Sequence, residues 1–340
     1  MLSADDHGRV ATIFDVARLA GVSHQTVSRV LNDLPNVRAA TKERVEQAIR
    51  QLNYVPSQAA RALVTRRSRT IGLVATGLPD WGPSSIVLSF NRSARAAGYA
   101  VVSANPADVE GATLRSAAEM LIRQSVEAIV LLASERGALD AFADWDLGIP
   151  FIAIASEARG RGVRVTLDQY AGARRAVAHL QELGHRDIRH IAGPVGSMDA
   201  EERLRGWRDA LRDAGWHPAE PLRGDWTSTS GYEIGRRLLA EGTPDAVFAS
   251  NDQMALGLLH AVQEAGLRVP DDLSVVGFDD VPDAAHFSPP LTSVRQDFTA
   301  LGQEAMAAVL AQITDEDTPI APEPRVPELI VRASTRPALR

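Results

Sequence analysis

From residue 70 onward, the sequence alternates short apolar runs with amphipathic stretches of helical period, and this alternation constrains the fold more than any other feature. The apolar runs are continuous, which is typical of strands buried on both faces of a parallel sheet. The expected strands are residues 71–75, 99–103, 128–132, 151–155, 164–167, 189–192, 246–249 and 273–277. The expected helices include residues 86–97, 114–124, 170–183, 203–214 and 254–265. Residues 70–340 form a segment longer than a single hydrophobic core usually spans, so the pattern predicts two parallel-sheet lobes. A ligand is expected between the lobes, at the carboxyl ends of the strands.

The first 55 residues predict three short helices instead. Thr12 is a good N-cap for the first helix, Asp15 completes an approximate capping box, and Gly21 ends the helix. Ser23 is expected to cap the second helix and Thr41 the third. The apolar faces comprise Ile13, Val16, Ala17 and Ala20; Val27, Val30 and Leu31; and Val45, Ala48, Ile49 and Leu52. Two helices joined by a short turn and closed by a third predict an all-α helix-turn-helix head.

The polar side of the second helix carries groups that can read base pairs. It comprises His24, Gln25, Ser28, Arg29 and Asn32. Glutamine can pair at two points with adenine and arginine with guanine, so this helix is expected in the major groove. Hydroxyls, amides and helix N-termini can hold phosphates, and the candidates are Thr12, Ser23, Thr26, Asn36 and Thr41. The alternative is a three-helix adaptor with a polar outer face.

The charge distribution favours a head that binds nucleic acid. Residues 1–70 hold 11 Lys and Arg against 6 Asp and Glu, whereas the remaining residues hold 25 against 37. A basic head on an acidic body is expected when only the head meets phosphates. Chance clustering on a solvated surface is the alternative.

Other function classes lack their sequence signals. No glycine-rich dinucleotide motif follows the first expected strand, and no phosphate-loop lysine motif or nucleophile elbow is present. His179, His185 and His190 are spread over a helix, a loop and a strand, so we interpret them as surface or core residues. The chain contains no cysteine, no basic-then-apolar leader and no long apolar run. We therefore expect a cytoplasmic protein that is not an enzyme and uses no metal or cofactor.

Polar and aromatic residues follow several of the expected strands. Asn251 and Asp252 follow one strand, Asp279 and Asp280 follow another, and Arg203 and Trp226 stand in loops or helix starts nearby. A sugar site needs carboxylates and amides for paired hydroxyls, a forked arginine donor, and an indole face for the C–H side of the ring. Taken singly, these residues are better explained as helix caps or core, but taken together at one rim they favour a pocket.

The N-terminal pattern resembles the LacI/GalR family of bacterial repressors. The runs TIFDVARLAGVSHQTVSRVLN and TKERVEQAIRQLNYVPSQAARAL carry this resemblance across residues 12–63. It implies that His24 and Gln25 set operator preference and that Arg29 is a shared base contact, with Asn32 and Tyr54 near the DNA backbone. His24 stands where the best-known member has tyrosine, so the preferred operator is expected to differ there.

Residues 56–67, PSQAARALVTRR, contain helix formers but too few turns for a stable isolated helix. The family resemblance implies a hinge helix that is ordered on DNA and lies in the minor groove. Leu63 then matches the apolar wedge that enters the central base step, and Ala60 the small residue that allows close approach. The alternative is an ordinary linker.

The core resembles the lactose-repressor branch of the family. The matching runs are IAGPVGSMDAEERLRGW, GDWTSTSG, ASNDQMALG, GLRVPDDLSVVGFDD and PPLTSVRQDF. By resemblance, Arg203, Asn251 and Asp279 form the sugar-binding trio, and the supporting residues are Ser84, Trp226, Gln296 and Phe298. This implies a periplasmic-binding-protein-like core and a galactose-like or other hexose-containing inducer.

Four positions of the core depart from that branch. Asp199 replaces a serine, and Asp108 stands where an arginine is expected. Leu132 and Ala155 fall where the branch presents polar groups. One end of the pocket is thus rebuilt around Asp199, which puts lactose-type inducers in doubt.

We therefore predict a head over residues 1–55, a hinge over 56–68 and a core over 69–340. The N-lobe is expected at about 69–167 and 297–327, and the C-lobe at about 168–296 and 328–340. A palindromic operator needs two heads, so a homodimer is expected, with residues 86–97 and 281–290 as interface candidates. The chain end carries no apolar heptads of the kind that assemble a tetramer. The predicted function is a sugar-released repressor; a corepressor-dependent regulator, a sugar-binding transport protein and a sugar-modifying enzyme are the alternatives.

Overall fold

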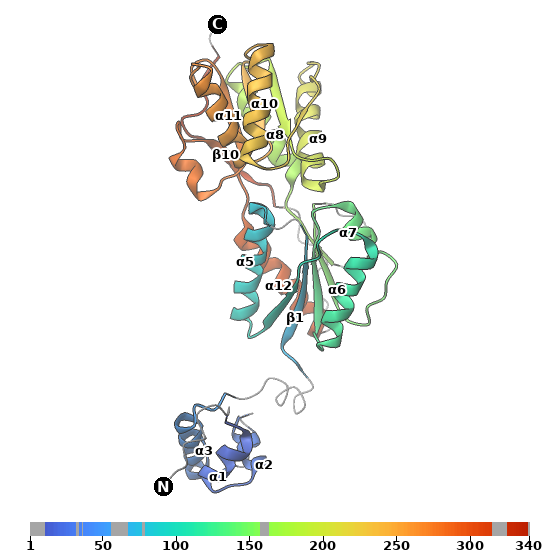
Figure 1. Cartoon of the computed structure of the whole chain (residues 1–340), viewed down its shortest axis with the longest axis vertical. Helices are drawn as coiled ribbons and strands as arrows, with labels where there is room; N and C mark the ends of the chain where they lie inside the picture. Colours follow the sequence, from blue (N-terminus) through green and yellow to red (C-terminus); the bar gives the residue numbers. More distant parts are fainter. Residues whose placement is uncertain are drawn as a thin grey trace. The chain divides into compact units, whose positions relative to one another are not determined.

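The chain folds into two compact units, Met1–Arg69 and Thr70–Arg340. The structure, a computed structural model, describes residues 11–31, 34–35, 37–55, 67–76, 79–156, 163–314 and 325–338 (Figure 1). Asn32, Asn36, Ala60 and Leu63, and with them most of the expected hinge, lie outside the described residues.

The first unit contains the helices α1 (Ile13–Ala20), α2 (His24–Leu31) and α3 (Ala39–Gln51). The predicted capping box is present, because the backbone N–H of Thr12 donates to the Asp15 carboxylate and that of Asp15 to the Thr12 hydroxyl. Gly21 ends α1 in the left-handed conformation at φ 64°. The Ser23 hydroxyl accepts from the Thr26 amide at 3.2 Å, as expected of an N-cap.

The predicted start of the third helix is wrong. Helix α3 begins at Ala39, with Arg38 at the N-cap and no side-chain cap. Thr41 already lies in the first turn, where its own amide donates to the Arg38 carbonyl at 2.9 Å. Two alanines, which favour helix strongly, extend the helix before the residue that was expected to cap it. The buried face is as predicted, since Val45 and Ala48 are 0% and 3% exposed.

The second unit contains two sheets. The first is fully parallel with the order β2-β1-β3-β4-β5. Its strands are β1 (Thr70–Ala75), β2 (Ala100–Ala104), β3 (Ala128–Leu132), β4 (Phe151–Ile154) and β5 (Val163–Val165). The second has the order β11-β10-β9-β8-β6-β7 and is parallel except for β11. Its strands are β6 (Ile188–Ala192), β7 (Leu222–Arg223), β8 (Ala246–Ala249), β9 (Ser274–Asp279), β10 (Thr292–Arg295) and β11 (Glu328–Ile330).

Helices cover the sheet of each lobe (Figure 1). Those around the first sheet are α5 (Trp81–Ala96), α6 (Gly111–Arg123), α7 (Arg136–Asp140) and α12 (Phe298–Thr314). Those around the second are α8 (Gln169–Glu182), α9 (Met198–Asp213), α10 (Ser228–Glu241), α11 (Asp252–Glu264) and the 3₁₀-helix η1 (Pro282–His286). None of the described helices is long and apolar enough to cross a membrane.

The chain passes between the lobes three times: after β5, after β10 and before β11. The second crossing returns α12 to the first lobe, where it packs against α5. There the Ser89 hydroxyl donates to the Thr299 carbonyl at 3.2 Å. These crossings bring the carboxyl ends of both sheets to one cleft, which is where open α/β sheets bind ligands.

Candidate functional site

The cleft between the lobes consists of two adjoining hollows. One is lined by Asp80, Trp81, Gly82, Pro83, Ser134, Ser197, Asp199, Arg203, Trp226, Asn251 and Asp279. The other lies toward the first sheet and shares Gly82, Pro83, Ser134 and Asp199 with the first. Because four residues line both hollows, a single ligand can extend through them.

Arg203 is the centre of the polar hollow. Its position in the second turn of α9 directs the side chain inward, and the residue is only 3% exposed. Its guanidinium donates to the Gln169 side chain at 2.9 Å and to the Ser250 carbonyl, and lies 3.4 Å from the Asp279 carboxylate. The group also lies over the ring of Phe278, with 3.9 Å to the centroid. The guanidinium is thus fixed in one orientation before any ligand arrives.

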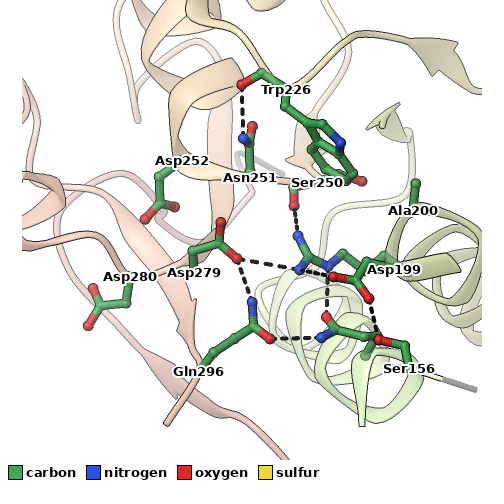
Figure 2. Close-up of polar contacts among 12 residues, drawn as sticks. Ser156, Asp199, Ala200, Trp226, Ser250, Asn251, Asp252, Asp279, Asp280 and Gln296 are labelled. Atoms are coloured by element: carbon green, nitrogen blue, oxygen red, sulfur yellow. Dashed lines mark hydrogen bonds and ion pairs between the residues drawn. The ribbon is translucent and has the colours of Figure 1, made fainter. Parts of the chain in front are cut away.

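Asp279 completes a chain of polar contacts across the base of the cleft. The Gln169 amide donates to Gln296 at 2.8 Å, and the Gln296 amide donates to Asp279 at 2.6 Å (Figure 2). Burial raises the pKa of Asp279 to about 6, although the nearby Arg203 guanidinium opposes this shift. Asp279 also has a φ of 101°, an unusual backbone conformation for an aspartate.

Asn251 is both a helix cap and a lining residue. Its side-chain oxygen accepts from the Met254 amide at 2.9 Å at the start of α11, so the capping alternative holds for this residue. Its amide group donates to the Trp226 carbonyl at 2.9 Å. Both Asn251 and the half-buried Trp226 still face the cleft. The cap therefore fixes the amide at the rim, where the residue is 5% exposed and its amide nitrogen also donates to the Gln253 side chain at 3.0 Å.

Asp252 and Asp280 follow the lining residues in sequence but do not line the cleft (Figure 2). Asp252 accepts from the Ser293 hydroxyl at 2.6 Å, and burial raises its pKa well above the ordinary value. Asp280 pairs with Arg295 at 2.7 Å and with Arg332 at 2.6 Å. These two acids support the end of β9 instead of contacting a ligand.

Asp199 joins the two lobes. Its carboxylate accepts from the hydroxyl of Ser156, which follows β4 (Figure 2). One residue earlier, the Met198 amide donates to the Ser134 carbonyl at 3.0 Å. The start of α9 is thus tied to two strand ends of the first lobe.

The remaining predicted cleft residues divide into two groups. Gln296 and Phe298 line the cleft. Leu132 and Ala155, two positions where the sequence differs from the lactose-repressor branch, also line it. Ser84 does not line either hollow, and its hydroxyl donates to the Pro79 carbonyl at 3.2 Å. Asp108 is exposed, accepts from the Glu110 amide and also lies outside both hollows.

Several lining residues were missed from sequence. The polar ones are Asp80, Ser134, Ser156, Gln169 and Ser197. Ser134 and Ser156 each follow an expected strand within two residues, so the strand-end rule would have identified them. Gln169 is the first residue of α8, and no sequence signal distinguishes it from other helix starts.

In the head, His24, Gln25 and Arg29 are exposed on α2, while Thr26 and Ser28 are half-buried. Arg29 donates to the Pro35 carbonyl at 3.1 Å. The Tyr54 ring packs in the head core and is 9% exposed.

Sequence reasoning also missed Phe14 in the head. This residue is 60% exposed, and its ring lies 5.2 Å from that of His24. An exposed phenylalanine beside a side chain that is predicted to read bases is a candidate for contact with a thymine methyl group.

His190, a buried histidine of the core, packs and hydrogen-bonds within its lobe. His190 is buried, stacks on Phe248 and has its pKa lowered to about 3 by burial, so the ring is neutral. Its Nδ1 lies 2.8 Å from the Phe248 carbonyl. No group of three possible metal ligands occurs among the described residues.

Comparison with known proteins identifies the family. Residues 12–57 match the model for bacterial regulatory proteins of the lacI family, and residues 177–335 match a periplasmic binding protein-like domain. The lactose operon repressor of Escherichia coli K12 is 36% identical over 303 residues, which cover 88% of this chain and 84% of that protein. The chain belongs to the LacI family. It is therefore a DNA-binding transcriptional regulator, and the predicted resemblance is confirmed.

Two solved structures extend the comparison to three dimensions. The Lac repressor dimer bound to operator and the anti-inducer ONPF has a TM-score of 0.89 at 34% identity, covering 96% of this chain and all of that one. A complex of the transcriptional regulator CelR with cellobiose has a TM-score of 0.71, also at 34% identity, covering 95% and 99%. The predicted fold, a helical head on an α/β periplasmic-binding-protein-like core, is confirmed.

Proposed function

We propose that this LacI-family regulator represses a sugar-utilisation operon from a palindromic operator and is released when a neutral, hexose-containing sugar fills the cleft. The observation that carries the proposal is the convergence of Arg203, Asp279 and Asn251 beside Trp226 in one hollow. A forked donor, a carboxylate acceptor and an amide suit adjacent sugar hydroxyls, and the indole suits the C–H face of the ring.

The charge of the hollow argues against anionic effectors. Among the described residues that line it, Asp80, Asp199 and Asp279 stand beside one cation, Arg203. Burial raises the pKa of Asp80, and the carboxylate of Asp225 raises it further, so negative charge is already crowded at this rim. A sugar phosphate or carboxylate would add to this repulsion, whereas a neutral sugar would not.

The working unit is a homodimer in the cytoplasm, where operator DNA lies. The Lac repressor relative is solved as a dimer on its operator, which supports the same assembly here. Leu88 of α5 is 54% exposed and lies within the interface candidate 86–97. In each head, α2 enters the major groove with His24, Gln25, Ser28 and Arg29, and Thr12, Ser23, Thr26 and Thr41 lie toward the DNA backbone.

The proposal is tested by selecting an operator from random duplexes and measuring binding by fluorescence anisotropy at several salt concentrations, with and without sugars. Steeply salt-dependent binding that a sugar weakens supports the proposal. A sugar that strengthens binding would instead establish the corepressor alternative. If no sugar binds the protein and none changes its affinity for the operator, a sugar effector is contradicted.

Sugar affinity is expected to decrease as the pH falls through about 6. The folded-state pKa of Asp279 is raised to about 6, so its carboxylate is ionised above that pH and protonated below it. Because the ionised form is the better acceptor for sugar hydroxyls, Kd should rise by up to about tenfold per pH unit below 6. Calorimetry between pH 7.5 and 5 measures this, and Asp279→Asn should bind weakly with no such dependence. An unchanged Kd in the wild type over this range would show that Asp279 does not bind the sugar as a carboxylate.

Gly193→Ala is expected to weaken sugar binding without affecting operator binding. A Cβ at Gly193 would lie 2.3 Å from the Trp226 ring, so the indole must move from its place in the cleft. Loss of the indole face should raise the Kd for sugar roughly tenfold. Val195→Ala, in the same loop and 80% exposed, is the matched control and should bind sugar like the wild type. Equal sugar affinity of the two variants would argue against contact between Trp226 and the sugar.

A further inference from the structure

His190 is a buried polar residue that does not itself line the cleft. It lies on β6, is 1% exposed, and its ring is stacked between those of Phe248 and Trp207, with 4.7 Å and 5.3 Å between centroids. An apolar ring would satisfy this packing, whereas a buried imidazole also needs partners for both ring nitrogens. The hydrogen bonds of His190 therefore indicate a role other than packing.

Both ring nitrogens of His190 have a partner. Nδ1 lies 2.8 Å from the Phe248 carbonyl oxygen, and because a carbonyl can only accept, Nδ1 carries the proton. Burial lowers the pKa of His190 to about 3, so the ring is neutral and Nε2 is an acceptor. The Ser250 hydroxyl therefore donates to Nε2, at 3.3 Å. His190 thus bonds both to the backbone of β8 and to the residue that follows this strand.

Ser250 connects His190 with the cleft. Ser250 is fully buried, and its amide donates to the Ile191 carbonyl at 2.8 Å. Its own carbonyl accepts from the Arg203 guanidinium (Figure 2). The next residue, Asn251, lines the cleft and caps α11. A shift of Ser250 would therefore displace both Arg203 and Asn251.

A second set of contacts connects His190 with Arg203 through aromatic rings. Phe248, which is stacked on His190, lies beside Phe278 with 6.2 Å between centroids. The Arg203 guanidinium in turn lies over Phe278, 3.9 Å from the centroid. A ring face supports the guanidinium but does not set its direction within the plane, because hydrogen bonds, not ring contacts, are directional there. The Ser250 carbonyl is one of the acceptors that set this direction.

We propose that His190 is a positioning residue for the sugar site, which acts through Ser250 to fix the Arg203 guanidinium. This inference rests on the proposed function, because Arg203 must bind the sugar for its position to matter. The one unprotonated nitrogen of the imidazole keeps the Ser250 hydroxyl directed at β6. Without this acceptor the buried hydroxyl would be unpaired, and Ser250 would shift to find another partner.

Two measurements on the full-length protein test this role. Calorimetry gives the Kd for the sugar that a thermal-shift screen of methyl glycosides of galactose, glucose, mannose and xylose identifies. NMR of arginine-labelled protein without sugar follows the Arg203 Nε–H, which donates to Gln169 at 2.9 Å and is assigned by its absence in Arg203→Lys. His190→Phe keeps a ring in the stack but removes both nitrogens. We expect it to raise the Kd about fivefold and to accelerate hydrogen exchange of the Nε–H about tenfold.

Further variants distinguish positioning from packing. Ser250→Ala should cause similar changes, and the double variant should be no worse than the more affected single variant, because both substitutions break the same bond. His190→Gln keeps a donor and an acceptor and should stay within about twofold of the wild type. His185→Phe is the matched control. His185 is a 4% exposed histidine of the same lobe, its Nε2 lies 2.9 Å from the Arg336 carbonyl, and its replacement should change neither measurement.

The outcomes separate the inference from the proposed function. An unchanged Arg203 signal in both His190→Phe and Ser250→Ala overturns the inference. Changes in Kd that multiply in the double variant, or that appear equally in His185→Phe, also overturn it. If no sugar binds the wild type, the proposed function fails, while the Arg203 signal still shows whether His190 positions that residue. If His190→Phe does not fold, Ser250→Ala decides the question by the same two measurements.

Discussion

Arg203→Ala is expected to lower the free energy of unfolding of the core by about 3–5 kcal/mol and to eliminate release from the operator by sugar. The buried guanidinium holds Gln169, the Ser250 carbonyl and Asp279 together, and its loss leaves the Asp279 carboxylate without its cation. Urea unfolding measures the stability, and operator anisotropy with added sugar measures release. Because a protonated Asp279 needs no cation, the loss of stability should be smaller at pH 5 than at pH 7.5.

Arg205→Ala is the matched control for this change. Arg205 lies on the same helix but is exposed; it forms a surface ion pair with Glu202 and lies over the Tyr170 ring, 4.0 Å from the centroid. A surface ion pair contributes at most about 1 kcal/mol. Arg203→Lys keeps a positive charge and should preserve folding better, while sugar binding is still impaired because a lysine lacks the forked donor. If the sugar concentration that releases the wild type from the operator also releases Arg203→Ala, the sugar binds elsewhere.

Gly257→Val is expected to destabilise the core by about 3 kcal/mol or more. A Cβ at Gly257 of α11 would lie 1.9 Å from the Ser228 carbonyl oxygen and 2.5 Å from the Tyr232 amide nitrogen of α10. The obstacles are backbone atoms, so the two helices must separate and lose the packing between them. The urea midpoint of unfolding, followed by circular dichroism, measures the effect.

A surface change on the same helix controls for helix propensity. Gln263 is exposed, so Gln263→Ala should change the free energy of unfolding by less than about 0.5 kcal/mol. Retention of wild-type stability by Gly257→Val would mean that α10 and α11 do not pack as closely in solution as the contact at Ser228 requires.

Local periodicity was sufficient to predict much of the fold. All eight expected strands are present, because a continuous apolar run is recognisable without knowledge of its neighbours. The strands β7, β10 and β11 were not predicted. β7 has two residues and β11 three, and β11 exists only because β10 offers its edge for antiparallel pairing. In such short edge strands, the pairing partner decides the conformation more than the side chains do.

The family resemblance identified Arg203, Asn251 and Asp279 as a sugar-binding trio, and all three line one hollow in the structure. For Asp280, the next residue, position in the sequence did not predict whether the side chain lines the cleft. Asp279 and Asp280 both have positive φ, 101° and 51°, so the chain turns and Asp280 pairs with arginines away from the cleft. A conformation that is rare for aspartate cannot be inferred from the residue type.

The sequence alone thus determined the head, the alternating core and the family, because helix caps, period and motif are properties of neighbouring residues. Only the tertiary structure decided that Gln169, Ser134 and Ser156 join the cleft and that Ser84 does not line it. It alone also showed which hydrogen bonds Ser134, Ser156 and Gln169 make in the cleft. Those contacts join segments up to 127 residues apart across the lobe crossings, and no local pattern encodes which hydrogen-bond partner a polar side chain meets there.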